Sequence, residues 1–205
     1  MRGNRIFFVE YLRGLDLYTE GIEVAFDKYF SELLRVNQVV NLFSRKMSSE
    51  DVWTKHFMDS VSVFEVYRDW SGKKVLDFGT GGGLPGIPIK IVAPECEMTL
   101  LDSTKKKIEA IKSIMGNDKL SYLSCRLEDQ EMDAYVNYFD IIVCRSVKVT
   151  PILQRAMSKV LKRTGKIFLY KATSFEDAKL FKNHTVHKLD LEILGERRIV
   201  EVNYG

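Results

Sequence analysis

Apolar positions in the first 70 residues recur at helical spacing. In residues 22–36 apolar side chains return at steps of three and four, which predicts an amphipathic helix. Ser48 stands three residues before Asp51 and resembles a capping box, so a second helix is expected from there to about residue 67. The aromatic side chains of that helix are expected in the core rather than on a base-stacking surface. Residues 1–70 are therefore predicted to form an N-terminal helical extension.

From residue 73 onward, short apolar runs alternate with amphipathic segments. This alternation is typical of an α/β fold, in which parallel strands are joined by right-handed helical crossovers. The last two runs follow each other without a helix, so we expect these strands to pair antiparallel. Residues 71–205 are thus predicted to form a doubly wound core around a seven-stranded, mostly parallel sheet with an antiparallel last strand. The predicted strands are 73–78, 97–102, 120–125, 139–144, 166–170, 185–193 and 197–203, and the predicted helices are 85–92, 103–115, 151–161 and 174–182.

The first predicted strand of this core ends in a carboxylate and a glycine-rich turn. Residues 75–86 read Val-Leu-Asp-Phe-Gly-Thr-Gly-Gly-Gly-Leu-Pro-Gly, and Asp102 ends the next strand, 23 residues after Gly79. Glycine lets the backbone approach a ligand closely, and a carboxylate at the end of the second strand can hold ribose hydroxyls. The pattern predicts a site for an adenosine-containing cofactor.

Other classes of glycine-rich turn are distinguished by their neighbouring residues. No Gly-Lys-Ser/Thr is present, which disfavours an ATP-binding P-loop. A dinucleotide fingerprint would need glycine at position 84, where the chain has Leu84, and this weakens a nicotinamide enzyme. Asp77, two residues before Gly79, is similar to the first motif of Rossmann-like S-adenosyl-L-methionine (AdoMet) methyltransferases. A glycine-rich turn without any ligand is the remaining alternative.

Composition bounds the class of protein. Apolar residues make up 45% of the chain and charged residues 29%, as in ordinary soluble proteins. No apolar run approaches the roughly 20 residues of a membrane span, and a signal peptide is not expected. Cys96, Cys125 and Cys144 are scattered and contain no Cys-x-x-Cys pair, which argues against disulfides and a zinc site. We expect a cytoplasmic monomer without a metal or a membrane partner.

Charge is distributed unevenly along the chain. The formal net charge is +3, but residues 141–205 carry 13 Lys and Arg against 6 Asp and Glu, a local balance of +7. Residues 1–70 and 71–140 each carry 9 basic against 11 acidic residues. A basic face in the last third would favour a polyanion such as RNA, because phosphate neutralisation drives such binding. A solvated surface with no partner is the alternative.

Several motifs resemble one bacterial family. Residues 79–88 read Gly-Thr-Gly-Gly-Gly-Leu-Pro-Gly-Ile-Pro and resemble the first motif of the RsmG/GidB family. The resemblance covers about residues 20–203, and it implies the Rossmann-like class I methyltransferase fold, AdoMet as cofactor, and methylation of a guanine N7 in 16S ribosomal RNA of the small subunit. The other similar segments are Asn41-Leu42, Lys55-His56-x-x-Asp59-Ser60, Leu100-Leu101-Asp102-Ser103, Arg126-Leu127-Glu128-Asp129, Arg145-Ser146 and Gly195-Glu196-Arg197-Arg198.

The resemblance also implies cofactor contacts. Gly79 and Leu84 would line the methionine and ribose side of AdoMet, and Gly81 would permit the close turn. Asp102 would accept hydrogen bonds from both ribose hydroxyls, since a carboxylate offers two acceptor oxygens. Asp77 would hold the glycine loop or meet the ammonium group of the cofactor.

Further implied residues lie beyond the second strand. Leu127 and Glu128 correspond to the pair that contacts adenine in the family. Arg145 follows a buried strand, where a charge has no packing reason to exist, and it would bind the cofactor carboxylate or an RNA phosphate and position the reactants. The candidate RNA contacts are Lys55, His56, Arg197 and Arg198, and for His56 a core histidine is an equal alternative.

Other methyl acceptors would leave other marks. Exocyclic-amine methylases usually carry Asn/Asp-Pro-Pro-Tyr after the fourth strand, where this chain has Cys144 and Arg145 followed by Ser and Val. Cytosine C5 methylases need a cysteine nucleophile, commonly beside proline, and Cys144 lacks that context. A methyltransferase for small molecules or proteins, and an RNA-binding assembly factor without catalysis, remain alternatives.

Overall fold

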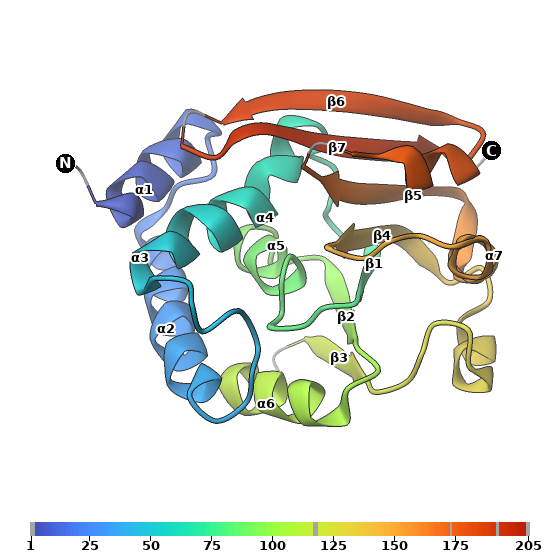
Figure 1. Ribbon diagram of the computed structural model, residues 1–205, viewed down its shortest axis with the longest axis horizontal. Helices are drawn as coiled ribbons and strands as arrows, with labels where there is room; N and C mark the ends of the chain where they lie inside the picture. Colours follow the sequence, from blue (N-terminus) through green and yellow to red (C-terminus); the bar gives the residue numbers. More distant parts are fainter. Residues whose placement is uncertain (1–2, 117–118, 173, 192, 204–205) are drawn as a thin grey trace.

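A seven-stranded mixed sheet forms the centre of the computed structural model, which describes residues 3–116, 119–172, 174–191 and 193–203 (Figure 1). The strand order is β3-β2-β1-β4-β5-β7-β6, and in the described sheet β7 alone runs antiparallel to its neighbours. Both the parallel core and the antiparallel final pair are as predicted. The strands are β1 (Lys74–Phe78), β2 (Glu97–Leu101), β3 (Leu120–Leu123), β4 (Phe139–Arg145), β5 (Leu161–Lys171), β6 (His184–Leu191) and β7 (Gly195–Asn203).

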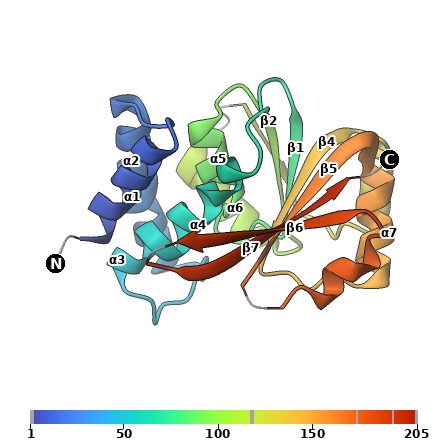
Figure 2. The ribbon, with the colours of Figure 1, turned by 90° about the horizontal axis from the view of Figure 1, so that it is seen from above.

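Helices cover both faces of the sheet (Figure 2). The helices α5 (Gly86–Val92) and α6 (Lys105–Met115) lie on one face, and α7 (Pro151–Val160) lies on the other. Successive strand residues point to opposite faces, so Val75 packs with the first set of helices and Leu76 with the second. Two apolar clusters result, one on each side of the sheet.

The N-terminal helices extend the first of these layers. Helix α2 (Glu20–Asn37) confirms the predicted helix, and α1 (Asn4–Gly14) was not predicted. Phe8 and Leu12 of α1 are buried in the same apolar cluster as residues of β1 and β2. The extension therefore shares its core with the sheet, and the division at residue 70 stays a prediction.

The second predicted helix exists, but it is not one regular α-helix. Ser48 caps its start as expected, since its hydroxyl accepts from the Asp51 amide at 3.2 Å. The chain then passes through a short α-helix, a π-helix, another short α-helix and a 3₁₀ turn. π-helical turns often occur at functional sites. The segments are α3 (Ser49–Val52), η1 (Trp53–Met58), α4 (Asp59–Val61) and η2 (Ser62–Glu65).

Three helices differ in detail from the predictions. Helix α6, predicted from residue 103, begins at Lys105 after Thr104, and the Asp102 carboxylate accepts from the Thr104 amide at 2.9 Å. The helix predicted at 174–182 is present as the shorter 3₁₀ helix η4 (Glu176–Leu180), and a further 3₁₀ helix, η3 (Gln130–Tyr135), was not predicted. Within the described ranges, no helix combines the length and the apolar character needed to cross a membrane.

Candidate active site

The loop after β1 depends on glycine for its backbone conformation. Gly79, Gly81 and Gly83 have φ of +74°, +55° and +86°, in the region that side chains with a Cβ rarely adopt. A Cβ at Gly79 would also lie 2.7 Å from Cγ2 of Val147. The loop therefore brings main chain, rather than side chains, to the carboxyl edge of the sheet.

Asp77 ties this loop down from behind. Its side chain is fully buried, and Oδ2 accepts from Thr80 Oγ1 at 2.6 Å and from the Gly86 amide at 2.8 Å. Burial raises the pKa of Asp77 to about 6, although both hydrogen bonds oppose the rise. Among the described residues, Oδ1 has no partner. These bonds support the first of the two roles expected for Asp77, that of holding the glycine loop.

Asp102 connects the loop to the second strand. Its Oδ2 accepts from the Gly81 amide at 3.0 Å, while Oδ1 accepts from Thr104. A carboxylate has about four lone-pair sites, so this half-buried group can still accept from a ligand. Asp102 is thus held in place by the protein at the position expected of a ribose acceptor.

A cavity of about 280 Å³ opens in front of these groups. It brings together Gly79, Asp102, Leu127 and Glu128, which the sequence placed in one cofactor site. Leu127 is buried and Glu128 is exposed at the rim. The sequence did not foresee the other lining residues, which are Phe78, Leu101, Ser103, Cys125, Arg126, Val147 and Leu153.

Four other candidates for cofactor contact do not line this cavity, and one of them, Arg145, lines a second cavity described below. Gly81 contributes through its bond to Asp102, and Asp77 lies behind the loop. Leu84 is buried in the core beside the helices, and its side chain is not part of the lining of this cavity. A contact through its backbone stays a prediction.

A second cavity, of about 230 Å³, lies beside the first and is strongly basic. Its lining contains Arg145 and all four candidate RNA residues, drawn from three distant parts of the chain. Five lining residues are Lys or Arg, and Asp59 is the one acid among them. The full lining, which we call the basic pocket, is Lys55, His56, Asp59, Arg145, Ser146, Tyr170, Lys171, Ala172, Arg197, Arg198 and Ile199.

Arg145 has partners within the protein. Its Nη1 donates to Asp59 Oδ2 at 3.0 Å and to the Lys55 carbonyl at 3.1 Å. The two side chains of the ion pair are 11% and 13% exposed, and Arg197 Nε lies 3.4 Å from Asp59 Oδ1. We expected that the charge of Arg145 has no role in packing, and this was wrong, because Arg145 joins β4 to the helical extension. Asp59 stood in a quoted motif, but only the fold shows that it orients two arginines.

His56 is held as a neutral side chain. Its Nδ1 lies 3.1 Å from Arg145 Nη2, which can only donate, and 3.2 Å from the Lys55 carbonyl, which can only accept. Burial, together with the neighbouring Arg145 charge, lowers the pKa of His56 to about 3. The ring also packs edge-on against Phe43 at 5.4 Å. His56 is consequently not a cation for phosphate at neutral pH.

The remaining basic candidates differ in how far their side chains are exposed and bound to the protein. Lys55 is exposed and pairs with Asp51 at 3.1 Å. Arg198 is 14% exposed, and its Nη1 donates to the Ala172 carbonyl at 2.6 Å. Its guanidinium also lies 5.8 Å from the centre of the Phe175 ring. Arg198 thus contributes to the structure of the wall, while Lys55 is open to solvent.

The chain from Arg145, the last residue of β4, to Val147 separates the two cavities. Val147 lines the first cavity, whereas Arg145 and Ser146 line the basic pocket. Ser146 has a φ of +60°, so the chain turns sharply between them. Ligands of open α/β sheets bind at the carboxyl ends of the strands, where both cavities lie.

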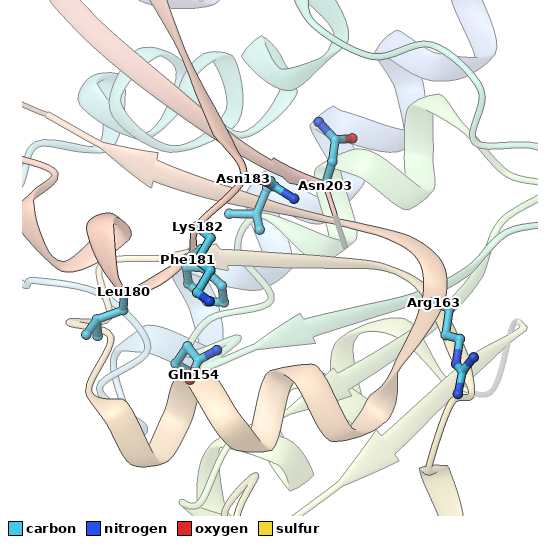
Figure 3. Close-up of a pocket in the computed structure, with 8 residues that line it drawn as sticks. Gln154, Arg163, Leu180, Phe181, Lys182, Asn183 and Asn203 are labelled. Atoms are coloured by element: carbon cyan, nitrogen blue, oxygen red, sulfur yellow. The ribbon is translucent and has the colours of Figure 1, made fainter. Parts of the chain in front are cut away.

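A larger cavity, of about 610 Å³, lies away from these groups (Figure 3). Gln154 of α7, Arg163 of β5 and Phe181 contribute to its walls. It lies toward the start of β5, at the edge opposite the carboxyl ends, and its described lining contains none of the predicted site residues. Size alone therefore does not identify the functional site of this molecule.

Solved structures with the same architecture define the class. The fibrillarin pre-rRNA processing protein of Methanococcus jannaschii aligns with a TM-score of 0.54 at 15% identity, covering 68% of this chain and 70% of its own. A predicted O-methyltransferase from Agrobacterium tumefaciens aligns at 0.57 and 14%, covering 73% and 79%. The chain has the Rossmann-like fold of class I methyltransferases.

Sequence comparison gives the family. The model of the GidB family, described as rRNA small subunit methyltransferase G, matches residues 22–194. Proteins named ribosomal RNA small subunit methyltransferase G are similar as well. The Lachnoclostridium phytofermentans protein is 35% identical over 84% of this chain and 72% of its own length, and that of Streptococcus sanguinis is 34% identical over 77% and 71%. The chain belongs to the GidB family.

Proposed function

We propose that this protein transfers a methyl group from AdoMet to N7 of a guanine in 16S ribosomal RNA of the small subunit. The observation that carries the proposal is that two cavities with different linings lie next to each other. A glycine-lined cavity with a fixed carboxylate adjoins a basic pocket across residues 145–147. Membership of the GidB family supports the same reaction.

The glycine-lined cavity fits AdoMet in its donor set. Gly79 has no Cβ, and a Cβ there would fill the space at the cavity wall, so a ligand can contact the Gly79 backbone. Asp102 offers acceptor oxygens for a ribose diol. Leu127 supplies an apolar surface for a purine ring, and Glu128 supplies an acceptor at the rim. When bound, AdoMet supplies an electrophilic methyl group on a sulfonium sulfur.

The protein contributes position rather than proton transfer. Guanine N7 has a lone pair and no proton, so its methylation needs no general base. This agrees with His56, which is neutral and engaged by Arg145, and with Asp77, which lies behind the loop. Holding two reactants in line can supply roughly 7–11 kcal/mol of the barrier.

The basic pocket would receive the RNA. Its lining holds five cations and one carboxylate, although Lys55, Lys171 and Arg198 also pair with acids outside the lining. Lys55 and Arg197 are the most exposed of the five and so the most accessible for phosphate contacts. Such contacts make affinity fall with salt. A ribosomal substrate would also give the enzyme a cytoplasmic location.

The test is transfer of labelled methyl from AdoMet to small-subunit RNA and to small-subunit particles, followed by nucleotide mapping. We expect one guanine to be labelled at N7 and Asp102→Ala to abolish most of the signal. Label at another atom would refute the proposed acceptor. AdoMet binding without transfer to either substrate would refute the reaction, and no AdoMet binding in calorimetry would favour a non-catalytic RNA-binding factor.

A further inference from the structure

The segment that separates the two cavities is anchored at both ends. At its start, Arg145 is bound to the helical extension through Asp59. At its far end, the backbone of residues 147–149 is bound to a buried ion pair from β5 and η4. Neither member of that pair belongs to a motif that the sequence pattern distinguishes.

This second anchor is formed by Lys171 and Asp177. Their side chains meet at 2.6 Å and are only 10% and 12% exposed. Asp177 Oδ2 also accepts from the Val149 amide at 2.7 Å, and Lys171 Nζ donates to the Val147 carbonyl at 3.3 Å. Burial opposes ionisation of Asp177, but the hydrogen bonds from Lys171 and Val149 outweigh it and lower the pKa.

The contacts of the pair indicate a role beyond stability. A buried ion pair is weak evidence for stabilisation, since desolvation of both charges offsets their attraction. The hydrogen bonds of this pair end on the main chain of the wall itself. The Val147 side chain lies on the cofactor side of that wall, against Gly79, so movement of its carbonyl would shift the cavity surface.

We propose that Lys171 and Asp177 are positioning residues, which hold residues 146–149 so that the two cavities meet at the geometry required for transfer. The proposal rests on the proposed methyl transfer. A displacement of about 1 Å in such a wall can lower a rate about a hundredfold, even when the substituted residue does not touch the reacting atoms.

The experiment compares Asp177→Asn and Lys171→Gln with a matched control. Glu176→Gln removes a carboxylate from the same 3₁₀ helix, where Glu176 pairs with Lys179 and is 71% exposed. In methyl transfer to small-subunit particles, we expect kcat to fall at least tenfold in both variants. KM for RNA and the AdoMet dissociation constant should stay within threefold, Lys171→Arg should restore kcat to within threefold, and Glu176→Gln should match the wild type.

A second readout does not depend on turnover. Hydrogen exchange of the Val149 amide should accelerate at least tenfold in Asp177→Asn but not in Glu176→Gln. Unchanged exchange would overturn the proposal even if the wild type transfers no methyl group, a result that would separately refute the proposed function.

Three other outcomes would also decide whether the pair positions this segment. A rise in KM for RNA with normal kcat would make Lys171 a direct RNA contact. Loss of kcat in proportion to AdoMet affinity and Tm, or failure of both variants to fold, would make the pair purely structural. Each of these results overturns the positioning role.

Discussion

The charge of Asp77 should cost the folded protein stability at neutral pH. Asp77→Asn removes that charge and keeps a carbonyl oxygen for the Thr80 hydroxyl and the Gly86 amide. Because the shape is nearly unchanged, a comparison across pH isolates the ionisation of this one buried group.

The magnitude follows from the raised pKa. A pKa that moves from its ordinary value of 3.8 to about 6 on folding corresponds to about 3 kcal/mol. Between these pH values the folded state binds the proton and the unfolded state does not, so this group destabilises the wild type progressively as pH rises from 4 to 6. The Asn variant lacks this ionisation, and its stability relative to the wild type should therefore rise by about 2.5 kcal/mol between pH 4 and pH 8, because part of the change already lies below pH 4.

Urea unfolding followed by the fluorescence of the buried Trp53 and Trp70 measures this difference. A constant offset from the unpartnered Asn amide cancels when the two pH values are compared. The exposed Asp69, changed to Asn, controls for the loss of one carboxylate. Identical differences at both pH values would refute the reasoning that burial governs Asp77. In calorimetry at pH 8, Asp77→Asn should weaken AdoMet less than Asp102→Ala does, and the reverse order would favour contact of Asp77 with the ammonium group.

Three further variants test the two cavities. Asp102→Ala should weaken AdoMet binding by about 1.5–3 kcal/mol, the scale of hydrogen bonds to a charged group; unchanged affinity in calorimetry would remove Asp102 from the cofactor site. Arg145→Lys keeps the charge but loses the planar fork that reaches the helical extension, so methyl transfer should fall at least tenfold, about 1.4 kcal/mol. Near-wild-type transfer kinetics would contradict that role. Lys55→Ala combined with Arg197→Ala should reduce the slope of log affinity against log salt for RNA by about two, with AdoMet affinity unchanged. Lys106→Ala, on an exposed helix face, is the control, and equal slopes would make the basic pocket a solvated surface.

Periodicity was sufficient for the regular helices, because each buries one apolar face in the core. It failed where partners distant in sequence decide the structure. Helix α1 is short, and Glu10 interrupts its apolar run, so its stability depends on Phe8 packing against Trp53 and Phe57. The π-helix around Phe57 was not predicted either, because a change from i+4 to i+5 hydrogen bonding leaves the apolar spacing nearly unaltered.

The candidate site was predictable in part for a topological reason. Gly79, Asp102 and Leu127 converge because they follow three adjacent parallel strands at the same edge of the sheet. The role of Asp59 could not be predicted from the chain, since its partner Arg145 lies 86 residues away and the contact exists only once the helices dock on the sheet. The burial of the Leu84 side chain could not be predicted, because a motif gives position in the chain but not the direction of a side chain.

The insertion of β7 between β5 and β6 sets an order on the biogenesis of this enzyme. Translation produces β6 before β7, yet in the described sheet β6 pairs with β7 alone. Until β7 emerges, β5 keeps a bare edge and β6 has no neighbour, a state prone to intermolecular pairing. Arg197, which lies in β7, also completes the wall of the basic pocket. A nascent chain therefore completes the wall of the basic pocket only at the last step of sheet assembly.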